Sequence, residues 1–163
     1  MNLREELLIG RPLEAGQETI LAVLLTREYV ARLLDELLFK PEGITDQQYN
    51  VLRILKGGPP EGYLIREVRR RMIIRNADVP RLVARLVANG LVRRQEDPVD
   101  RRGCRVQLTP KGTELEARLV RPQASLRKRL EKILSTEESA TLCGLLERLR
   151  DGIREALGEA PVG

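Results

Sequence analysis

The chain has 163 residues, enough for one globular domain with added helices, and its 29 Lys and Arg against 24 Asp and Glu give a net charge of +5. It has no histidine, no glycine-rich phosphate loop, no Cys/His metal-ligand spacing and no paired carboxylates in an apolar context, so we expect no catalysis, metal or cofactor. Charge interrupts every apolar stretch, so neither a signal peptide nor a membrane span is expected, and the cytoplasm is the predicted location.

The positive charge is concentrated in the middle of the chain. Residues 43–112 hold 15 Lys and Arg against 7 Asp and Glu, whereas the two flanks together hold 14 against 17. A cationic centre of this kind indicates contact with a polyanion. Most of these cations are arginines, which can bind phosphate or guanine through two parallel hydrogen bonds. The alternative is a solvated charged surface without a nucleic-acid partner.

A long amphipathic helix is predicted over residues 17–39. Its apolar side chains recur at steps of three and four residues. They are Ile20, Leu21, Leu24, Leu25, Val30, Leu33, Leu34, Leu37 and Leu38. Residues 1–42 are therefore interpreted as an N-terminal dimerisation region, which ends at the break around Pro41 and Gly43.

The centre of the chain reads as a helix-turn-helix. Thr45 and Gln48 form a capping box that opens a helix. After the break GGPPEG, a short helix is predicted over residues 65–72, and a further helix follows over residues 77–89. Gly90 is expected to end that helix in a left-handed conformation.

The helix over residues 77–89 has the composition of a recognition helix. Asn76 is expected to cap it, and Asp78 to lie in its first turn. Arg81 and Arg85 lie one turn apart on one face, where they can enter the major groove or bind its phosphates. The opposite face is apolar and is predicted to point inward; it carries Leu82, Val83 and Leu86.

Two strand-like runs, LVRRQ and CRVQL, flank an arginine-tipped loop and predict a DNA-binding wing. Its predicted DNA-binding residues are Arg94, Asp100, Arg101, Arg102 and Arg105. Arginines at the tip can enter the minor groove, and Asp100 can orient a neighbouring guanidinium. The alternative is that Asp100 and Arg102 only hold the hairpin together. Residues 43–112 are therefore predicted to form a winged helix-turn-helix DNA-binding domain.

Two helices are predicted after the wing. Thr109 caps the first, with Pro110 in its first turn, and Pro122 predicts a kink or brief interruption near Val120. Ser135 and Glu138 form a capping box for the second helix. Its apolar stripe consists of Leu142, Leu145, Leu146, Leu149, Ile153 and Leu157. Residues 113–163 are interpreted as C-terminal dimerisation helices.

The predicted fold is mainly α with a small β-wing: a winged helix-turn-helix plus N- and C-terminal dimerisation helices. A monomer has few places to bury three apolar stripes. Pairing with the same helices of a second subunit buries them and sets two recognition helices on one face of a two-fold homodimer. The alternative is that the stripes pack on the chain's own winged domain.

Four motifs occur in order at family-like spacings. They are the helix start Ile44, Thr45, Gln48, Tyr49, Val51, Leu52 and Leu55; the helix core Arg81, Leu82, Val83, Arg85 and Leu86; the step Gly90, Leu91, Val92 and Arg94; and the wing pair Asp100 and Arg102, followed by Leu108, Thr109 and Gly112. With these motifs, residues 17–157 resemble the MarR family of transcriptional regulators. The resemblance favours Arg102 as the residue inserted into DNA.

The chain departs from the family pattern at two positions. Pro80 stands where the family commonly has Thr or Ser, which removes a hydroxyl contact to DNA and restricts the start of the recognition helix to the residues just before it. Arg69 stands where a small alanine is usual. The run from Arg69 to Arg71 is expected to be partly solvated and partly directed at phosphates.

The resemblance implies an effector, because other family members respond to small aromatic or phenolic anions in the cleft between the dimer helices and the DNA-binding lobe. The residues that would line such a cleft here are Tyr29, Arg32, Tyr49 and Arg53. The alternative is that these are core tyrosines and surface arginines. Cys104 and Cys143 are interpreted as small structural residues rather than redox sensors.

These features predict a sequence-specific regulator of transcription, a repressor that binds double-stranded DNA as a homodimer on a pseudo-palindromic operator and is released by a small-molecule effector. Two alternatives from other classes remain: a non-specific architectural DNA-binding protein, and a winged-helix protein-interaction module. Salt dependence and competition with bulk DNA discriminate among the three.

Overall fold

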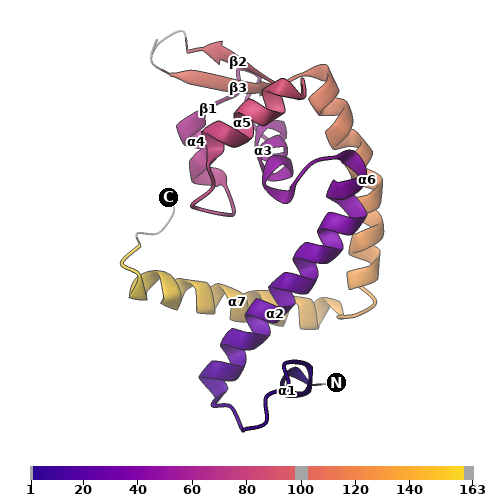
Figure 1. Cartoon of the computed structure of the whole chain (residues 1–163), viewed down its shortest axis with the longest axis vertical. Helices are drawn as coiled ribbons and strands as arrows, with labels where there is room; N and C mark the ends of the chain where they lie inside the picture. The colour runs from indigo at the N-terminus through magenta and orange to yellow at the C-terminus, as the bar shows by residue number, and fades with distance from the viewer. Residues whose placement is uncertain (1, 98–102, 160–163) are drawn as a thin grey trace. The chain divides into compact units, whose positions relative to one another are not determined.

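The computed structural model describes residues 2–97 and 103–159 (Figure 1). The chain forms two compact units, Met1–Val120 and Arg121–Gly163. The described residues are mostly helical, with one three-stranded antiparallel sheet, which confirms the predicted fold class. No helix among them is long and apolar enough to cross a lipid bilayer.

The first unit begins with two helices, α1 (Leu3–Glu6) and α2 (Ala15–Leu34). The second continues through a π-helical turn, η1 (Asp35–Phe39), and a 3₁₀ turn, η2 (Lys40–Glu42), so the long helix predicted over residues 17–39 is confirmed. Gly43 ends it with a left-handed φ of 66°. No residue of α2 is buried within the chain, whereas Leu38 and Phe39 of the π-helical turn are.

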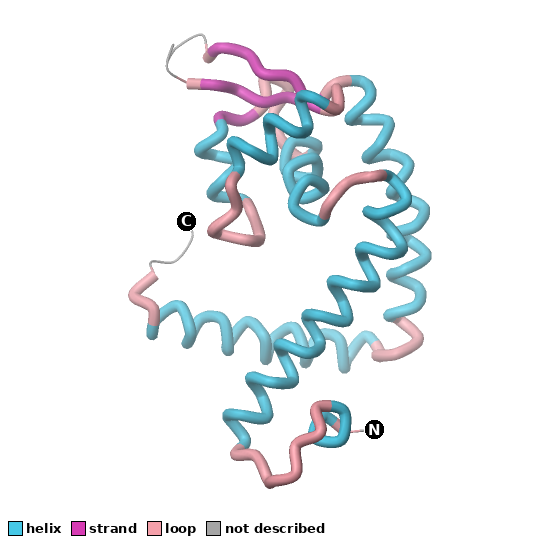
Figure 2. The backbone as a smooth tube through the Cα atoms, in the orientation of Figure 1, coloured by secondary structure: helices cyan, strands magenta, loops and turns pink. Residues whose placement is uncertain are grey.

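The centre of the chain folds as a winged helix. Its elements are α3 (Asp46–Lys56), β1 (Tyr63–Leu64), α4 (Ile65–Arg71), α5 (Val79–Ala88), β2 (Val92–Glu96) and β3 (Cys104–Leu108). The strands lie in the order β1-β3-β2, all antiparallel, and Figure 2 shows the sheet on one side of these helices. The pairing of Arg94 with Val106 and of Glu96 with Cys104 confirms the wing hairpin.

Aliphatic side chains from the helices and the sheet form one core. The largest fully buried ones are Leu52, Leu86, Leu119, Val51, Val68, Val79, Val83 and Val106. The inward apolar face predicted for the recognition helix is confirmed, because Leu82, Val83 and Leu86 are all buried. This packing fixes the rotation of α5 about its own axis, and so determines which of its side chains face outward.

The start of the recognition helix was predicted at Ala77 with Asn76 as its cap, and that prediction is wrong. Asp78 is the cap, because its side chain accepts the backbone N–H of Arg81 at 3.2 Å, and α5 begins at Val79. Asn76 lies exposed in the preceding turn, whose backbone bonds Ala77 N to Ile74 O. Pro80, which has no N–H to donate, occupies the first helical turn as expected.

Two helices follow the wing. In α6 (Pro110–Leu130), the predicted cap is confirmed, because Thr109 Oγ1 accepts the N–H of Gly112 at 3.1 Å. Pro122 does not interrupt the helix, because α6 continues through it to Leu130. The other predicted outcome, a kink near Val120, stays a prediction.

The second unit contains the end of α6 and α7 (Thr136–Ala156). The capping box predicted for Ser135 and Glu138 is confirmed, with hydrogen bonds of 2.8 and 3.2 Å. No residue of α7 is buried. Along its apolar stripe, Leu146 and Leu149 are half-buried, whereas Leu142, Leu145, Ile153 and Leu157 are exposed.

Candidate nucleic-acid interface

The outward face of α5 presents two arginines. Arg81 lies in its first turn and Arg85 one turn later, and both are exposed while the opposite face is buried. Neither guanidinium has an ion pair or hydrogen bond to any residue that the structure describes. Both groups therefore keep all their N–H donors available for phosphate oxygens or the acceptor edge of guanine.

Most other cations of residues 43–112 contact the protein itself. Arg53 donates to Asn50 Oδ1 at 2.8 Å, and Arg75 to the carbonyl of Arg70 at 2.8 Å. The guanidinium carbon of Arg71 lies 4.2 Å from the centre of the Tyr63 ring. Among the described residues of this segment, the arginines whose guanidinium groups have no such contact are Arg69, Arg70, Arg81 and Arg85. They lie on α4 and α5, the two helices of the helix-turn-helix.

Two predicted residues at the N-terminal end of α5 have different environments. Asp78 uses a carboxylate oxygen to cap the helix, while Asn76 is exposed in the turn before it. Asp78 thereby holds the backbone of Arg81 in place. Its geometry supports a positioning role within the helix start, where a negative side chain also complements the helix dipole.

The structure places two predicted wing residues differently. Arg94, on β2, is exposed and donates to the carbonyl of Pro80 at 3.3 Å, which joins the wing to the first turn of α5. Arg105, on β3, is half-buried and forms an ion pair with the buried Asp97. Asp100, Arg101 and Arg102 lie outside the described residues.

The residues predicted for an effector cleft lie in two places. On α2, the Arg32 guanidinium carbon is 6.0 Å from the centre of the Tyr29 ring. The hydrogen bond from Tyr29 to the carboxylate of Glu6 raises the pKa of Tyr29 above its usual value. On α3, Tyr49 stacks on Phe39 with 5.1 Å between ring centres.

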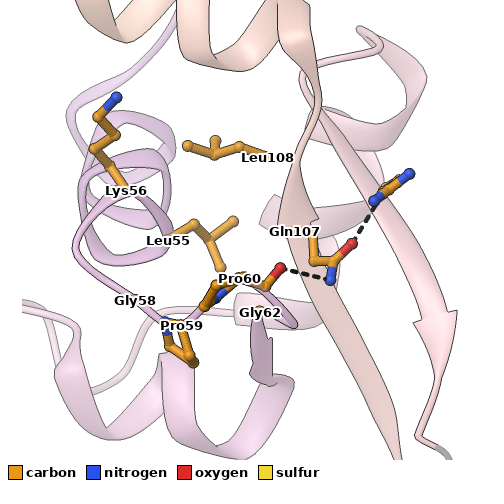
Figure 3. A pocket seen from close by; sticks show the side chains of 9 residues that line it. Leu55, Lys56, Gly58, Pro59, Pro60, Gly62, Gln107 and Leu108 are labelled. Carbon is orange, nitrogen blue, oxygen red and sulfur yellow. Dashed lines mark hydrogen bonds between the residues drawn. The ribbon is translucent and has the colours of Figure 1, made fainter.

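A cavity of about 190 Å³ lies elsewhere, beside the loop that precedes β1 (Figure 3). Its lining residues are Leu55, Lys56, Gly58, Pro59, Pro60, Gly62, Arg93, Gln107 and Leu108, none of which was predicted as a site residue. The volume is below the roughly 300 Å³ at which ordinary ligand pockets begin. Gln107 in its wall is a buried polar residue that joins this loop to the wing.

Both cysteines are free thiols. Cys104 is half-buried at the start of β3, with its Sγ 3.7 Å from the carbonyl oxygen of Arg105, while Cys143 is exposed on α7. Among the described residues no group of His, Cys, Asp and Glu has the arrangement of a metal site.

Comparison with known proteins connects this geometry to gene regulation. The family model of the MarR family matches residues 42–103. A protein from Thauera aromatica, named for transcriptional regulation of the hcr operon, is 30% identical over 108 residues, 66% of this chain. The match spans 64% of that protein's length.

Solved structures share the fold over most of their length. A MarR transcription factor from Planctomyces limnophilus is 31% identical, with a TM-score of 0.62 over 84% of this chain and 98% of that one. A mutant MarR from E. coli complexed with operator DNA is 29% identical, with a TM-score of 0.71 over 78% of this chain and 90% of that one. Bordetella bronchiseptica BpsR, whose DNA binding is regulated by 6-hydroxynicotinic acid, is 25% identical, with a TM-score of 0.66 over 79% and 97%.

The family motifs, the exposed arginines of the helix-turn-helix and these relatives agree. The chain belongs to the MarR family of transcriptional regulators, proteins that act by binding DNA and not as enzymes.

Proposed function

We propose that this regulator is a sequence-specific repressor that reads its operator with α5 and the wing. The observation that carries the proposal is that the unengaged guanidinium groups of the described winged helix, those of Arg69, Arg70, Arg81 and Arg85, all lie on α4 and α5. In helix-turn-helix proteins the first helix crosses the DNA backbone and the second enters the major groove. Arg81 and Arg85 are therefore assigned to bases, and Arg69 and Arg70 to phosphates.

The wing completes the proposed contact. Arg101 and Arg102 supply positive charge at its tip, with Arg102 assigned to the minor groove and Asp100 to the orientation of its guanidinium. Arg94 links the base of the wing to the Pro80 carbonyl, which supports a shared orientation of wing and recognition helix. Residues 43–112 are assigned to DNA binding on this basis.

We assign residues 1–42 and 113–163 to dimerisation. Exposed apolar side chains lie on α2, where Ile20 is 60% and Leu24 55% exposed, and on α7, where Leu145 is 55% and Ile153 50% exposed. Contiguous apolar faces of this kind mark protein–protein contacts in soluble proteins. A second copy of the chain, related by a two-fold axis, covers them and places two α5 helices on successive major grooves of a pseudo-palindrome.

We further propose that a small aromatic anion releases the repressor from DNA. On α2, the Arg32 guanidinium carbon lies 6.0 Å from the centre of the Tyr29 ring. On α3, Tyr49, which stacks on Phe39, lies one helical turn before Arg53. The regulation of the BpsR relative by 6-hydroxynicotinic acid supports this class of ligand. Such a ligand acts by binding more tightly to the dimer whose recognition helices have the wrong spacing for the operator.

Addition of 6-hydroxynicotinic acid, used as a probe of the class, is expected to weaken operator binding by about fivefold to 150-fold, the usual range of allosteric coupling. Its neutral amide should have no such effect, since it lacks the carboxylate that pairs with a guanidinium. Arg32→Gln should reduce the response without changing DNA affinity in the absence of the acid. Equal affinity with and without the acid, across a panel of benzoates and nicotinates, would contradict the effector proposal.

The DNA-binding proposal is tested by selection from a library of randomised duplexes, followed by sequencing. We expect enrichment of an inverted repeat whose half-sites are about one helical turn, roughly 10 base pairs, apart. Recovery of DNA without a shared sequence would favour an architectural binder, and recovery of none would favour a protein-interaction module. Either result would contradict sequence-specific repression.

A further inference from the structure

A buried ion pair lies at the base of the wing. Asp97 follows β2, and its carboxylate accepts a hydrogen bond from Nε of Arg105 on β3. The side chain of Asp97 is only 3% exposed, and that of Arg105 is 23% exposed. Beside the pair, the backbone N–H of Asp97 donates to the carbonyl of Gly103 at 3.0 Å, which ties together the two points where the described sheet meets the wing tip.

The same side of β3 is also tied to the loop of residues 57–62. Arg105 donates from Nη1 to the carbonyl of Gly62 at 3.0 Å. Gln107, two residues further along the strand, donates to the carbonyl of Pro60 and accepts from Arg93 of β2, each at 2.9 Å (Figure 3). Side chains of a single strand therefore connect the wing hairpin to the loop before β1.

The loop approaches the wing so closely that only glycine fits at one position. Gly62 has a left-handed φ of 76°, and a Cβ atom placed there would lie 2.2 Å from the carbonyl oxygen of Val106. The contacts of Arg105 and Gln107 are thus made to a fixed backbone and not to a loose loop. A wing built on this base has a defined direction relative to the helices.

We propose that Asp97 and Arg105 are positioning residues for the DNA-binding wing, and that Arg105 does not bind phosphate itself. The inference rests on the proposed function and refines it, because the sequence alone groups Arg105 with the DNA contacts. The Nε and Nη1 donors of Arg105 are already used within the protein. A phosphate would have to draw the guanidinium away from the buried carboxylate and the backbone carbonyl to which it donates, which is costly.

The sign of the effect of Asp97→Asn discriminates between positioning and simple electrostatics. Removal of a negative charge from a DNA-binding face strengthens binding if only the net charge matters. Loss of the ion pair releases the wing base, so positioning predicts weaker binding to the selected duplex, by about tenfold, the scale of one lost wing contact. Glu96→Gln is the matched control, because Glu96 is an exposed carboxylate on β2, next to Asp97 in the sequence. The affinity of this variant for the selected duplex should equal or slightly exceed that of the unmodified protein.

The salt dependence of binding tests the role of Arg105. With Arg105→Gln, affinity for the selected duplex should fall about tenfold while the slope of log K against log salt stays unchanged, since a lost phosphate contact would reduce that slope by about 1. The double variant Asp97→Asn with Arg105→Gln keeps a neutral hydrogen-bonding pair and should lose no more affinity than either single variant. If circular dichroism shows that a single variant is unfolded, the affinity and salt slope of the double variant are measured instead.

Combination with Arg102→Ala separates positioning from general loss of structure. Once the minor-groove contact assigned to Arg102 is gone, Asp97→Asn should have little further effect on affinity, because the main contact that the pair positions is already lost. Additive losses, a slope reduced by about 1 for Arg105→Gln, or tighter binding by Asp97→Asn would each overturn the inference. Failure of the unmodified protein to prefer the selected duplex would instead contradict the proposed function, so the two failures are distinguishable.

Discussion

Leu142→Glu is expected to convert the protein from a dimer to a monomer and to abolish tight operator binding. Leu142 lies on the apolar stripe of α7, a helix with no buried residue, and is itself 44% exposed. In a two-fold interface each substitution occurs twice. Each leucine contributes about 1.5–3 kcal/mol to the free energy of association when it is buried, so the loss of two raises the dimer dissociation constant by about a hundredfold or more. Burial of the two new carboxylates would raise it further. Sedimentation equilibrium over a range of concentrations measures this constant.

The matched control is Ala140→Glu. Ala140 is exposed on the same helix, two residues away from Leu142 and on the opposite side from the apolar stripe. The substitution therefore adds the same charge as Leu142→Glu, but to a face that the proposed dimer leaves in water. Its dimer constant and operator affinity should equal those of the unmodified protein. If Leu142→Glu and Ala140→Glu gave the same dimer constant, the assignment of the α7 stripe to the interface would be wrong.

Arg81→Ala is expected to weaken binding to the selected duplex by about 1–3 kcal/mol. It should also reduce the difference in affinity between the selected and the scrambled duplex. Arg81 lies in the first turn of α5, where recognition helices contact base edges, and its guanidinium has no partner among the described residues. Its loss does not disturb the core, because the buried face of the helix carries Leu82, Val83 and Leu86. Fluorescence-anisotropy titrations against both duplexes measure the change.

Arg69→Ala provides the comparison for that result. Arg69 is exposed on α4 and is assigned to a phosphate, so its loss should weaken binding to selected and scrambled DNA by the same factor and reduce the salt slope by about 1. If Arg81→Ala behaved in this uniform way, Arg81 would be a phosphate contact and base reading would have to be assigned elsewhere on α5.

Local sequence signals were sufficient for most helix boundaries. Thr45 with Gln48, and Ser135 with Glu138, cap the helices that they were predicted to cap, because a capping box is complete within four residues. The same reasoning misplaced the start of α5, where Asn76 and Asp78 are both good caps. The choice between them depends on the turn that buries Ala77, and that turn is not apparent from capping preferences.

The candidate interface was predictable only where helical periodicity determines exposure. Arg81 and Arg85 face outward because their neighbours Leu82, Val83 and Leu86 face the core. The surroundings of Arg105 were not predictable, since its partners Asp97 and Gly62 lie 8 and 43 residues away along the chain. A sequence with several arginines in one segment does not reveal which of them are engaged within the protein.

We propose that this regulator distinguishes its operator from other DNA. A fluorescence-anisotropy titration of the full chain against the selected duplex and against a scrambled duplex of equal length, at two salt concentrations, measures this discrimination. We predict a preference of about a thousandfold or more for the selected duplex, with two chains bound per duplex. Equal and steeply salt-sensitive binding to both duplexes would contradict sequence-specific recognition.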